Sequence, residues 1–515
     1  MNIYKDILKK NLGKLLNLYD MDPSSPTLGY GDRSYWGWKT SDYANATMQG
    51  GVHSLAIALK LNLHENKEVL LLTIDQAIKA IPSIQDTKGG LQEAYPLEHS
   101  FCVTALIAFD VLSAVQLLDL EQAKKKEYIS IVEPLIEFIS KYDEEHAIIS
   151  NHLATAVAAI ALWNKTVNKQ NNRDKELLQI IYNHQSKEGW HKEYDGADQG
   201  YQTLCIYYLS AAYLATKDDT LKDSIAHSLS FLKYYIHPDN TVGGLYGSRN
   251  TEVYYPGGVV ALSNVLEDAN IFANAMKDGI TQESHLLPEQ IDAGNYIPLL
   301  NSYAFAALHY EETNNNDELP CKTVFEKDFS DAGIFVKSTN SYYSIVNYKK
   351  GGTIKVFNKT SNQLDIEDGG LLAIDNRGRT SSTQQYDSSI DFSKKEITAN
   401  FYLIDKSSLT PIKMILLRLL SLTVFKSIGL GNSFKKMVVK KLMTGKNKTK
   451  GKAVRKFHFT ENKIQISESI ISGEHFKSVN HAGKFKAIHM ASSGYYTKQT
   501  IPNTQASDLV EYNRI

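Results

Sequence analysis

The sequence predicts a multidomain protein in which an (α/α)6 toroid is followed by an antiparallel β-sandwich with a basic amphipathic helical insert. Three observations lead to this fold class. Residues 1–315 contain six helical patterns rich in small residues, which recur about every 50 residues. After a polar linker at 316–325, apolar residues alternate with a period of two through 326–515. Residues 406–460 interrupt this alternation with 14 Lys or Arg and no Asp or Glu.

Composition narrows the class of protein. The chain has 515 residues, of which 43% are hydrophobic and 22% are charged, and these values exclude a mainly disordered protein. With 56 Lys or Arg and 57 Asp or Glu, no overall basic field favours nucleic acid as a partner. Three widely spaced cysteines predict neither a disulfide framework nor a zinc site. Charges interrupt the apolar residues of the N-terminus, unlike in a signal peptide, so we expect a cytoplasmic protein, free or peripheral at the inner membrane face.

Each of the six small-residue patterns follows a loop, and most of these loops are rich in glycine and aromatic residues. The patterns begin near Thr47, Ser100, Asn151, Tyr201, Gly257 and Asn301. Longer patterns with charges on one helical face lie between them, for example at 67–81 and 219–236. Six hairpins of this kind are expected to close a ring with the small-residue helices inside. All six loops then meet at one mouth, whereas an open helical solenoid, the alternative, would keep them apart.

The basic insert, at about 408–450, has helical character. Within 412–444, apolar residues and Lys or Arg alternate at helical spacing, which predicts one or two amphipathic helices that protrude from the sandwich. An apolar face beside a purely basic face is typical of a helix that lies on anionic lipid. Arg418 and Lys426 interrupt the apolar run, which argues against a transmembrane span. The alternative is a helical excursion packed on the sandwich, with a solvated basic face.

The entrances of the third and fourth inner helices carry the candidate catalytic residues. Asn151 and His152 open the third helix, although Asn151 is equally suited to cap that helix and His152 to lie in the core. The next loop places a cluster of polar residues before the fourth helix, namely His191, Glu193, Asp195, Asp198 and Tyr201. Three carboxylates and a histidine are possible metal ligands, but this spacing matches no established site. We therefore expect neither a metal nor a cofactor.

Further candidates would bind the substrate. The fifth loop contains Tyr246, Arg249 and Tyr254, and an arginine among tyrosines is suited to hold a sugar carboxylate. The alternative for Arg249 is an ion pair with Glu252 that holds the loop together. The remaining candidates come from other loops and are Trp36, Trp38, Glu93, Tyr95, His99, His191 and Asp198.

Together with the toroid and sandwich patterns, the Asn151-His152 pair and the GYQT helix entry at Tyr201 resemble the heparinase II/III-type and alginate-lyase polysaccharide lyases. The resemblance in architecture covers nearly the whole chain. It implies β-elimination at a uronic acid: Asn151 would help to neutralise the carboxylate, His152 or Tyr201 would remove the C5 proton, and Tyr201 would protonate the departing O4. It also implies an acidic oligo- or polysaccharide as partner, free or lipid-linked. The stretch 351–380 ends in LLAIDNRGRT, similar to a strand and turn of that family, but it lacks the family's histidine.

Other functions stay open beside a lyase or an epimerase. A hydrolase would use two carboxylates from the group Glu93, Glu193, Asp195 and Asp198. A non-catalytic glycan-binding or scaffold protein of a surface-polysaccharide pathway would use the same mouth without chemistry. The glycine-rich loops also resemble those of terpenoid-cyclase and prenyltransferase toroids, although no DxDD-type acid or zinc constellation accompanies them.

Overall fold

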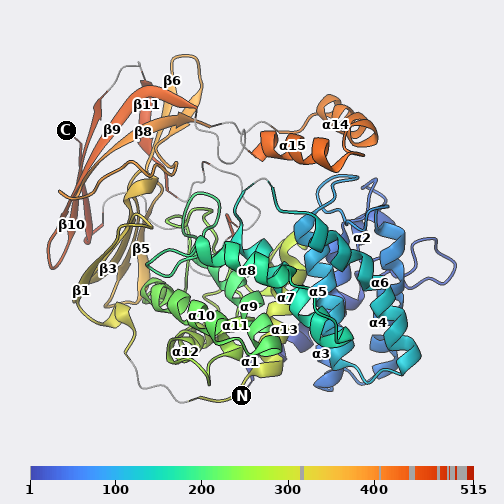
Figure 1. Ribbon diagram of the computed structural model, residues 1–515. Helices are drawn as coiled ribbons and strands as arrows, with labels where there is room; N and C mark the ends of the chain where they lie inside the picture. Colours follow the sequence, from blue (N-terminus) through green and yellow to red (C-terminus); the bar gives the residue numbers. More distant parts are fainter. Residues whose placement is uncertain are drawn as a thin grey trace.

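The computed structural model describes residues 2–514 apart from 146, 314–317, 405–407, 440–446, 472–475, 484–486, 488–492 and 496–506. Helices occupy the chain as far as His309, and the strands begin at Phe325 (Figure 1). Part of the expected linker, 316–317, lies outside the described residues. Within the described ranges, no helix has both the length and the apolar character needed to span a membrane.

Six inner helices form a closed ring. They are α3 (Gly51–Lys60), α5 (Phe101–Leu117), α7 (Ser150–Val167), α9 (Gln199–Thr216), α11 (Gly257–Ala261) and α13 (Ala293–His309). Each packs against the next, and α13 packs back against α3, so the predicted closed toroid is confirmed and the open solenoid is wrong. The outer helices are α1 (Ile3–Leu16), α4 (Lys67–Ile84), α6 (Gln122–Lys141), α8 (Arg173–Asn183), α10 (Asp219–Leu232) and α12 (Glu267–Thr281), and a short α2 (Arg33–Trp36) lies in the first loop.

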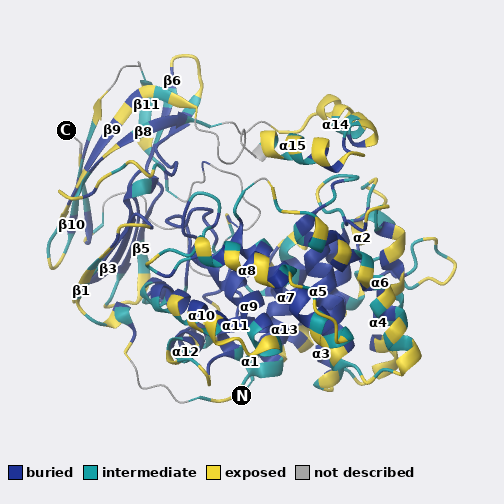
Figure 2. Ribbon diagram, in the orientation of Figure 1, coloured by how far each residue is buried: buried dark blue, intermediate teal, exposed yellow. Residues whose placement is uncertain are grey.

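Small side chains allow the inner helices to approach one another closely. These helices are buried along most of their length (Figure 2), and α7 is buried without interruption from Leu153 to Trp163. At Gly258 in α11, an added Cβ would lie 2.5 Å from the carbonyl oxygen of Ile206 in α9. A larger residue there would push the two helices apart, because close-packed interiors have no room to absorb it.

The sixth inner helix begins earlier than the sequence predicts. We expected it to start near Asn301, after a turn at 294–296, but α13 begins at Ala293. The Asp292 side chain accepts hydrogen bonds from the backbone N–H groups of Gly294 and Asn295, which caps the helix there. The supposed turn residues are therefore the first turn of α13.

Two sheets make up the second half of the chain. The five-stranded sheet has the order β1-β2-β3-β4-β5, and the seven-stranded sheet has the order β11-β6-β7-β8-β9-β10-β12. The strands are β1 (Phe325–Phe329), β2 (Ile334–Ser338), β3 (Tyr342–Asn347), β4 (Thr353–Asn358), β5 (Gln363–Asp368), β6 (Leu371–Asp375), β7 (Thr380–Ser382), β8 (Glu396–Leu403), β9 (Lys448–Phe459), β10 (Ile464–Ile471), β11 (Phe476–His481) and β12 (Val510–Arg514). Apolar residues of both sheets form one shared core, as in a sandwich. The pairing is antiparallel as predicted, except that β10 and β12 run parallel.

The sandwich is attached to the fifth toroid loop by a buried lysine. Lys350 Nζ donates hydrogen bonds to Leu245 O at 2.8 Å, Gly247 O at 2.5 Å and Asn250 Oδ1 at 2.5 Å. Asn347 Nδ2 adds a bond of 2.7 Å to Tyr246 O. Burial lowers the pKa of Lys350 to about 7. The sandwich therefore holds the loop that carries Arg249 in place.

The basic insert forms two helices, α14 (Pro411–Thr423) and α15 (Ile428–Val439), here called the α14–α15 hairpin. It protrudes from the sandwich, rather than packing on it, and lies over the loops of the toroid, a position that the sequence does not predict (Figure 1). Arg418 Nε donates to Asp42 Oδ2 at 2.5 Å, and Lys435 Nζ donates to Glu98 Oε1 at 3.1 Å. Acidic toroid loops thus attract part of the basic insert, which the sequence pattern of the insert alone does not reveal. The end of the predicted helical stretch, 440–444, lies outside the described residues.

Candidate functional site

A cavity of about 570 Å³ lies between the toroid loops and the α14–α15 hairpin. Its toroid side is polar and includes Glu93, Tyr95, Glu98, His152 and Tyr194. Its hairpin side is mainly apolar and includes Leu416, Leu417, Leu420, Phe434 and Val438. The cavity therefore offers hydrogen-bonding and ionisable groups on one wall and an apolar surface on the other.

Asn151 and Glu193 form a buried pair next in the chain to the cavity residues His152 and Tyr194. Asn151 lies in the first turn of α7, and its Nδ2 donates a hydrogen bond of 2.9 Å to Glu193 Oε2 in the fourth loop. Burial raises the pKa of Glu193 to about 8, and Asp198 adds to the rise, while Asn151 and Arg249 oppose it. Glu193 therefore carries a proton at neutral pH and is able to donate a hydrogen bond.

His152 and Glu144 form a second pair at the same helix entrance. His152 Nδ1 lies 2.7 Å from Glu144 Oε2, and the imidazole retains 23% exposure at the cavity wall. Because a carboxylate accepts hydrogen bonds, this contact places the ring hydrogen on Nδ1 and leaves the lone pair on Nε2. His152 is thus oriented as a general base.

Arg249 comes from the fifth loop and is completely buried. Its guanidinium stacks on the Tyr194 ring, 4.2 Å from the ring centroid, and its Nη2 lies 3.4 Å from Asp195 Oδ2. The buried Nε and Nη1 of Arg249 have no hydrogen-bond partner within the described part of the chain. Unsatisfied guanidinium donors are costly, and they suit a ligand carboxylate.

Glu98 and Lys435 form an ion pair at the cavity wall, where the hairpin meets the second loop. Glu98 Oε2 accepts hydrogen bonds from the backbone N–H groups of Glu93 and Ala94 at 3.1 and 2.8 Å, and Glu98 Oε1 accepts from Lys435. Burial raises the pKa of Glu93 to about 8, and the nearby Glu98 carboxylate adds to that rise. Glu93 is thus a second carboxyl group that is protonated at neutral pH.

The predicted catalytic residues meet only in part. The structure brings Asn151, His152 and Arg249 together through their contacts with Glu193, Glu144 and Tyr194. Tyr201 lies half-buried in the first turn of α9, where its backbone N–H donates to Asp198 Oδ1 at 3.1 Å. Asp198 Oδ2 also accepts from the backbone N–H of Arg249 at 2.8 Å. Asp198 is therefore a helix cap that ties two loops together, which differs from its expected substrate-binding role.

Three predicted substrate-binding residues lie in the core. His191 is buried between Ser224 Oγ and Ser228 Oγ, at 3.4 and 3.5 Å, and burial lowers its pKa to about 4. Tyr246 packs at the sandwich interface, where its hydroxyl contacts His237 Nε2 at 2.8 Å. Tyr254 packs on Phe272 and His285. These three assignments are corrected, because none of the three side chains lines the cavity and each is held by contacts within the protein.

The remaining predicted residues divide between the cavity and the loops around it. Glu93 and Tyr95 line the cavity as expected of binding residues. His99 joins the second loop to the hairpin, because Nδ1 pairs with Asp86 and Nε2 lies 3.1 Å from Phe425 O. Trp36 donates to Leu18 O at 2.8 Å, and Trp38 is 71% exposed. Neither tryptophan lines the cavity.

Sequence reasoning missed four residues of the site, namely Tyr194, Glu144, Glu98 and Lys435. Tyr194 follows Glu193 directly, so its place in the polar loop was a usable signal. Glu144 lies a short loop before His152 in the chain, and this nearness in sequence is a weaker signal. Lys435 reaches Glu98 from a segment 337 residues away, and no local pattern indicates such a contact.

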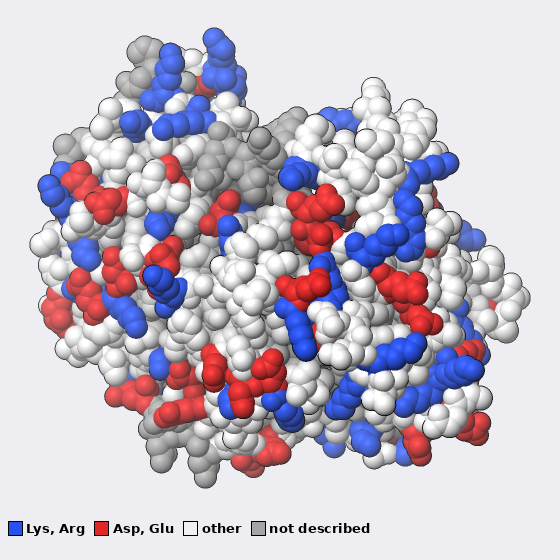
Figure 3. Space-filling view, viewed as in Figure 1, with Lys and Arg blue, Asp and Glu red and all other residues white. Residues whose placement is uncertain are grey.

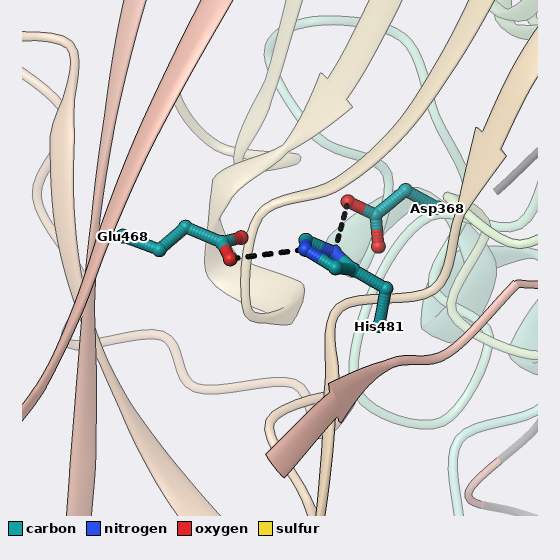
Figure 4. A group of neighbouring side chains, drawn as sticks. All are labelled: Asp368, Glu468 and His481. Carbon is teal, nitrogen blue, oxygen red and sulfur yellow. Dashed lines mark ion pairs between the residues drawn. The ribbon is translucent and has the colours of Figure 1, made fainter. Parts of the chain in front are cut away.

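A buried ionic cluster in the sandwich contains the possible metal ligands Asp368, Glu468 and His481 (Figure 4). Arg455 already lies among them: its Nη2 pairs with Asp368, and its Nε donates to Glu468 Oε1 at 2.9 Å. His481 Nε2 lies 3.2 Å from Glu468 Oε2. Arg455 thus supplies the positive charge that a metal would bring, and the cluster fits an internal salt-bridge network better than a metal site. His481 belongs to β11, which pairs with β6, so a histidine lies beside the LLAIDN stretch that has none of its own.

No protein-family model matches this chain, and no curated protein sequence matches it. Among solved structures, it is similar to a Streptomyces coelicolor chondroitin AC lyase in complex with chondroitin sulphate (TM-score 0.48, 9% identity), covering 78% of this chain and 64% of that one. It is also similar to a Paenibacillus xanthan lyase (TM-score 0.47, 12% identity), covering 78% of this chain and 44% of that one. An unsaturated glucuronyl hydrolase specific for heparin is similar at a TM-score of 0.41 and 11% identity, covering 60% of this chain and 95% of that one. This chain thus spans less than two thirds of both lyases.

Proposed function

We propose that this protein is a carbohydrate-active enzyme of surface-polysaccharide metabolism that cleaves an acidic glycan by β-elimination at a uronic acid. The observation that carries the proposal is that the cavity residues His152 and Tyr194 are each backed by a charged partner, Glu144 and Arg249, and that the buried pair of Asn151 and Glu193 adjoins them in the chain. Each pair supplies one requirement of the reaction. The names of the similar structures, two polysaccharide lyases and a glucuronyl hydrolase, agree with a carbohydrate substrate.

The first requirement is neutralisation of the uronate carboxylate, because its charge opposes removal of the neighbouring C5 proton. Arg249 brings a buried positive charge behind the Tyr194 ring of the cavity wall, and this charge acts on the carboxylate through space. Protonated Glu193, oriented by Asn151, adds a neutral donor. Donors fixed in a water-poor site stabilise developing negative charge more strongly than water does.

The second requirement is a base and an acid. In the proposed step, His152 Nε2 takes the C5 proton, and the electron pair left behind forms the C4=C5 double bond. The C4–O4 bond breaks at the same time, and O4 takes a proton from a tyrosine hydroxyl. Tyr201 is the acid that the resemblance implies, and Tyr194 is one of the two tyrosines that line the cavity, with Tyr95.

The test is to incubate the protein with a panel of acidic glycans and to record the ultraviolet absorbance of the unsaturated uronate product. Elimination predicts that absorbance and new reducing ends rise together. New reducing ends without the absorbance would contradict the lyase proposal and favour a hydrolase. Glycan binding without either signal would indicate a non-catalytic binding or scaffold protein.

A hydrolase is the second candidate, and one observation favours it. Glu93 lines the cavity, and its pKa of about 8 keeps it protonated, as a general acid of glycoside hydrolysis must be. Glu98 and Glu144 lie near enough to influence this pKa and are the carboxylates that would complete an acid–base pair. The Glu93→Gln variant separates the candidates, because it should abolish hydrolysis and spare elimination.

A further inference from the structure

We propose that the α14–α15 hairpin docks the toroid mouth onto an anionic membrane, so that the cavity receives its acidic glycan as a lipid-linked substrate. The substrate part rests on the proposed function, whereas the membrane part rests on the hairpin alone. Three features of the hairpin support the proposal: an exposed apolar stripe, a basic border, and a second apolar face that lines the cavity.

The first feature is the exposed apolar stripe. On α14, Ile412, Ile415, Leu419 and Leu422 are 79%, 62%, 57% and 60% exposed, and none of them lines the cavity. They recur at helical intervals, and Leu430 and Met437 on α15 continue the apolar surface with 55% and 58% exposure. Figure 3 shows a mainly uncharged surface at the place of the hairpin, while charged side chains of both signs are scattered over the rest of that face. A contiguous apolar surface of this kind marks an interaction site.

The second feature is charge, which identifies the partner. The hairpin, 411–439, contains no acidic residue, although the whole chain has 57. Arg418 and Lys435 face the toroid in ion pairs and Lys413 lines the cavity, but Lys426 and Lys436 are exposed and lie outside the cavity. Apolar side chains flanked by lysines complement a bilayer of anionic lipid, whose acyl region takes the former and whose headgroups attract the latter.

The third feature is the inward face of the same hairpin. Leu417, Leu420 and Phe434 line the cavity opposite His152 and Tyr194. One element therefore presents apolar side chains both to the outside and to the candidate site. A glycan attached to a lipid would place its sugar against the polar toroid wall while its lipid part stays next to the hairpin and the bilayer.

The membrane part is tested by sedimentation with vesicles of phosphatidylglycerol and phosphatidylcholine, compared with pure phosphatidylcholine. The wild type should bind the anionic vesicles at low salt and should be released by high salt. The variant Ile412→Ser/Ile415→Ser/Leu419→Ser, whose positions do not line the cavity, should lower the binding constant at least tenfold. Val69→Ser/Leu71→Ser/Leu72→Ser is the matched control, because these residues are exposed on α4 and should not affect binding.

Several outcomes would overturn the membrane proposal. They are failure of the wild type to bind anionic vesicles at low salt, equal loss of binding in the α4 control, and a dimer in solution that the hairpin variant converts to monomer. The last outcome would assign the stripe to a second copy of this chain. The charge-reversal variant Lys426→Glu/Lys436→Glu, whose positions do not line the cavity, keeps the test valid if the serine variant fails to fold, and it should abolish the preference for anionic vesicles.

The substrate part has its own readout. Vesicle-bound protein should cleave an acidic glycan attached to lipid at least tenfold faster than the same glycan in solution, and the hairpin variant should lose this advantage while it retains its rate on the soluble glycan. Equal wild-type rates on both forms would overturn the substrate assignment. Absence of elimination on every glycan, with vesicle binding intact, would instead contradict the proposed function and leave the docking surface standing.

Discussion

The Nδ1 atom of His152 lies 2.7 Å from Oε2 of Glu144, which orients the imidazole at the wall of the cavity. Glu144 belongs to the loop before α7, and His152 belongs to the first turn of that helix. The pair joins a group that can take a proton to a carboxyl group that fixes the orientation of its ring. This relationship is the basis of the first prediction.

We expect His152→Ala to lower kcat for elimination by about 10²–10⁴, the usual contribution of a general base. Glu144→Gln should lower kcat less, because it removes the negative charge but keeps the hydrogen-bonding shape. The measurement is the pH dependence of kcat/KM by ultraviolet absorbance. His64→Ala, at a half-buried histidine that does not line the cavity, should have no effect, and full activity of His152→Ala would show that the base lies elsewhere.

Two tyrosines compete for the role of general acid. If Tyr201 transfers the proton, Tyr201→Phe should abolish turnover and retain glycan binding, since it removes only the hydroxyl. If Tyr194 does so, Tyr194→Phe should have that effect and Tyr201→Phe should not. Calorimetric titration measures the binding. Tyr213→Phe on the same helix α9 serves as control, and loss of binding in either site variant would indicate a stacking or structural tyrosine instead.

The protonation of Glu193 predicts the alkaline limit of activity. Burial raises its pKa to about 8, so the neutral donor form prevails below that pH and is lost as the pH rises through it. Glu193→Gln is neutral at every pH and should remove this alkaline decline from the pH–rate profile. Glu93→Gln is the matched control, because the Glu93 carboxyl has a similar pKa. Removal of the decline by Glu93→Gln alone would assign the titration to Glu93.

The ionic cluster of the sandwich predicts how stability depends on pH. Burial lowers the pKa of His481, but Asp368 and Glu468 more than offset this and raise it to about 9. The folded-state pKa lies above the ordinary value, so the stabilisation is complete below pH 6.5 and is lost as the pH rises through about 9. His481→Gln should therefore lower the free energy of unfolding by about 1 kcal/mol at pH 6, allowing for screening by water, and by almost nothing at pH 10.

Urea denaturation at both pH values measures that difference. The control is His458→Gln, because His458 is an exposed histidine of β9 in the same sheet. A loss that is the same at pH 6 and pH 10 would mean that His481 stabilises the sandwich by packing rather than by charge.

Asp368 sets the acidic limit of the stability that the cluster provides. Burial opposes ionisation of Asp368, but Arg455 and His481 hold its pKa at about 2. Its contribution to stability is therefore lost only as the pH falls toward that value.

Local and periodic features were readable from the sequence. The six repeats, the closed ring and the two-part architecture follow from helical and strand periodicity, because a hydrophobic pattern repeats wherever a helix or strand must bury one face. The entrance at Asn151 and His152 was found because a helix start is a local event. The start of the sixth helix was predicted too late, because Gly294 suggested a turn. The Asp292 side chain caps the helix and places Gly294 within its first turn.

Contacts between distant segments were decided only by the tertiary structure. Tyr246 and Tyr254 resemble binding residues in sequence and are buried in the fold, since a tyrosine fits an interface and a sugar site equally well. The hairpin covers the toroid mouth because Lys435 meets Glu98 and Arg418 meets Asp42, and charge attraction depends on distance in space rather than on position in the chain. The proton held by Glu193 also depends on the tertiary structure, because the pKa of this carboxyl group rises only when folding removes it from water.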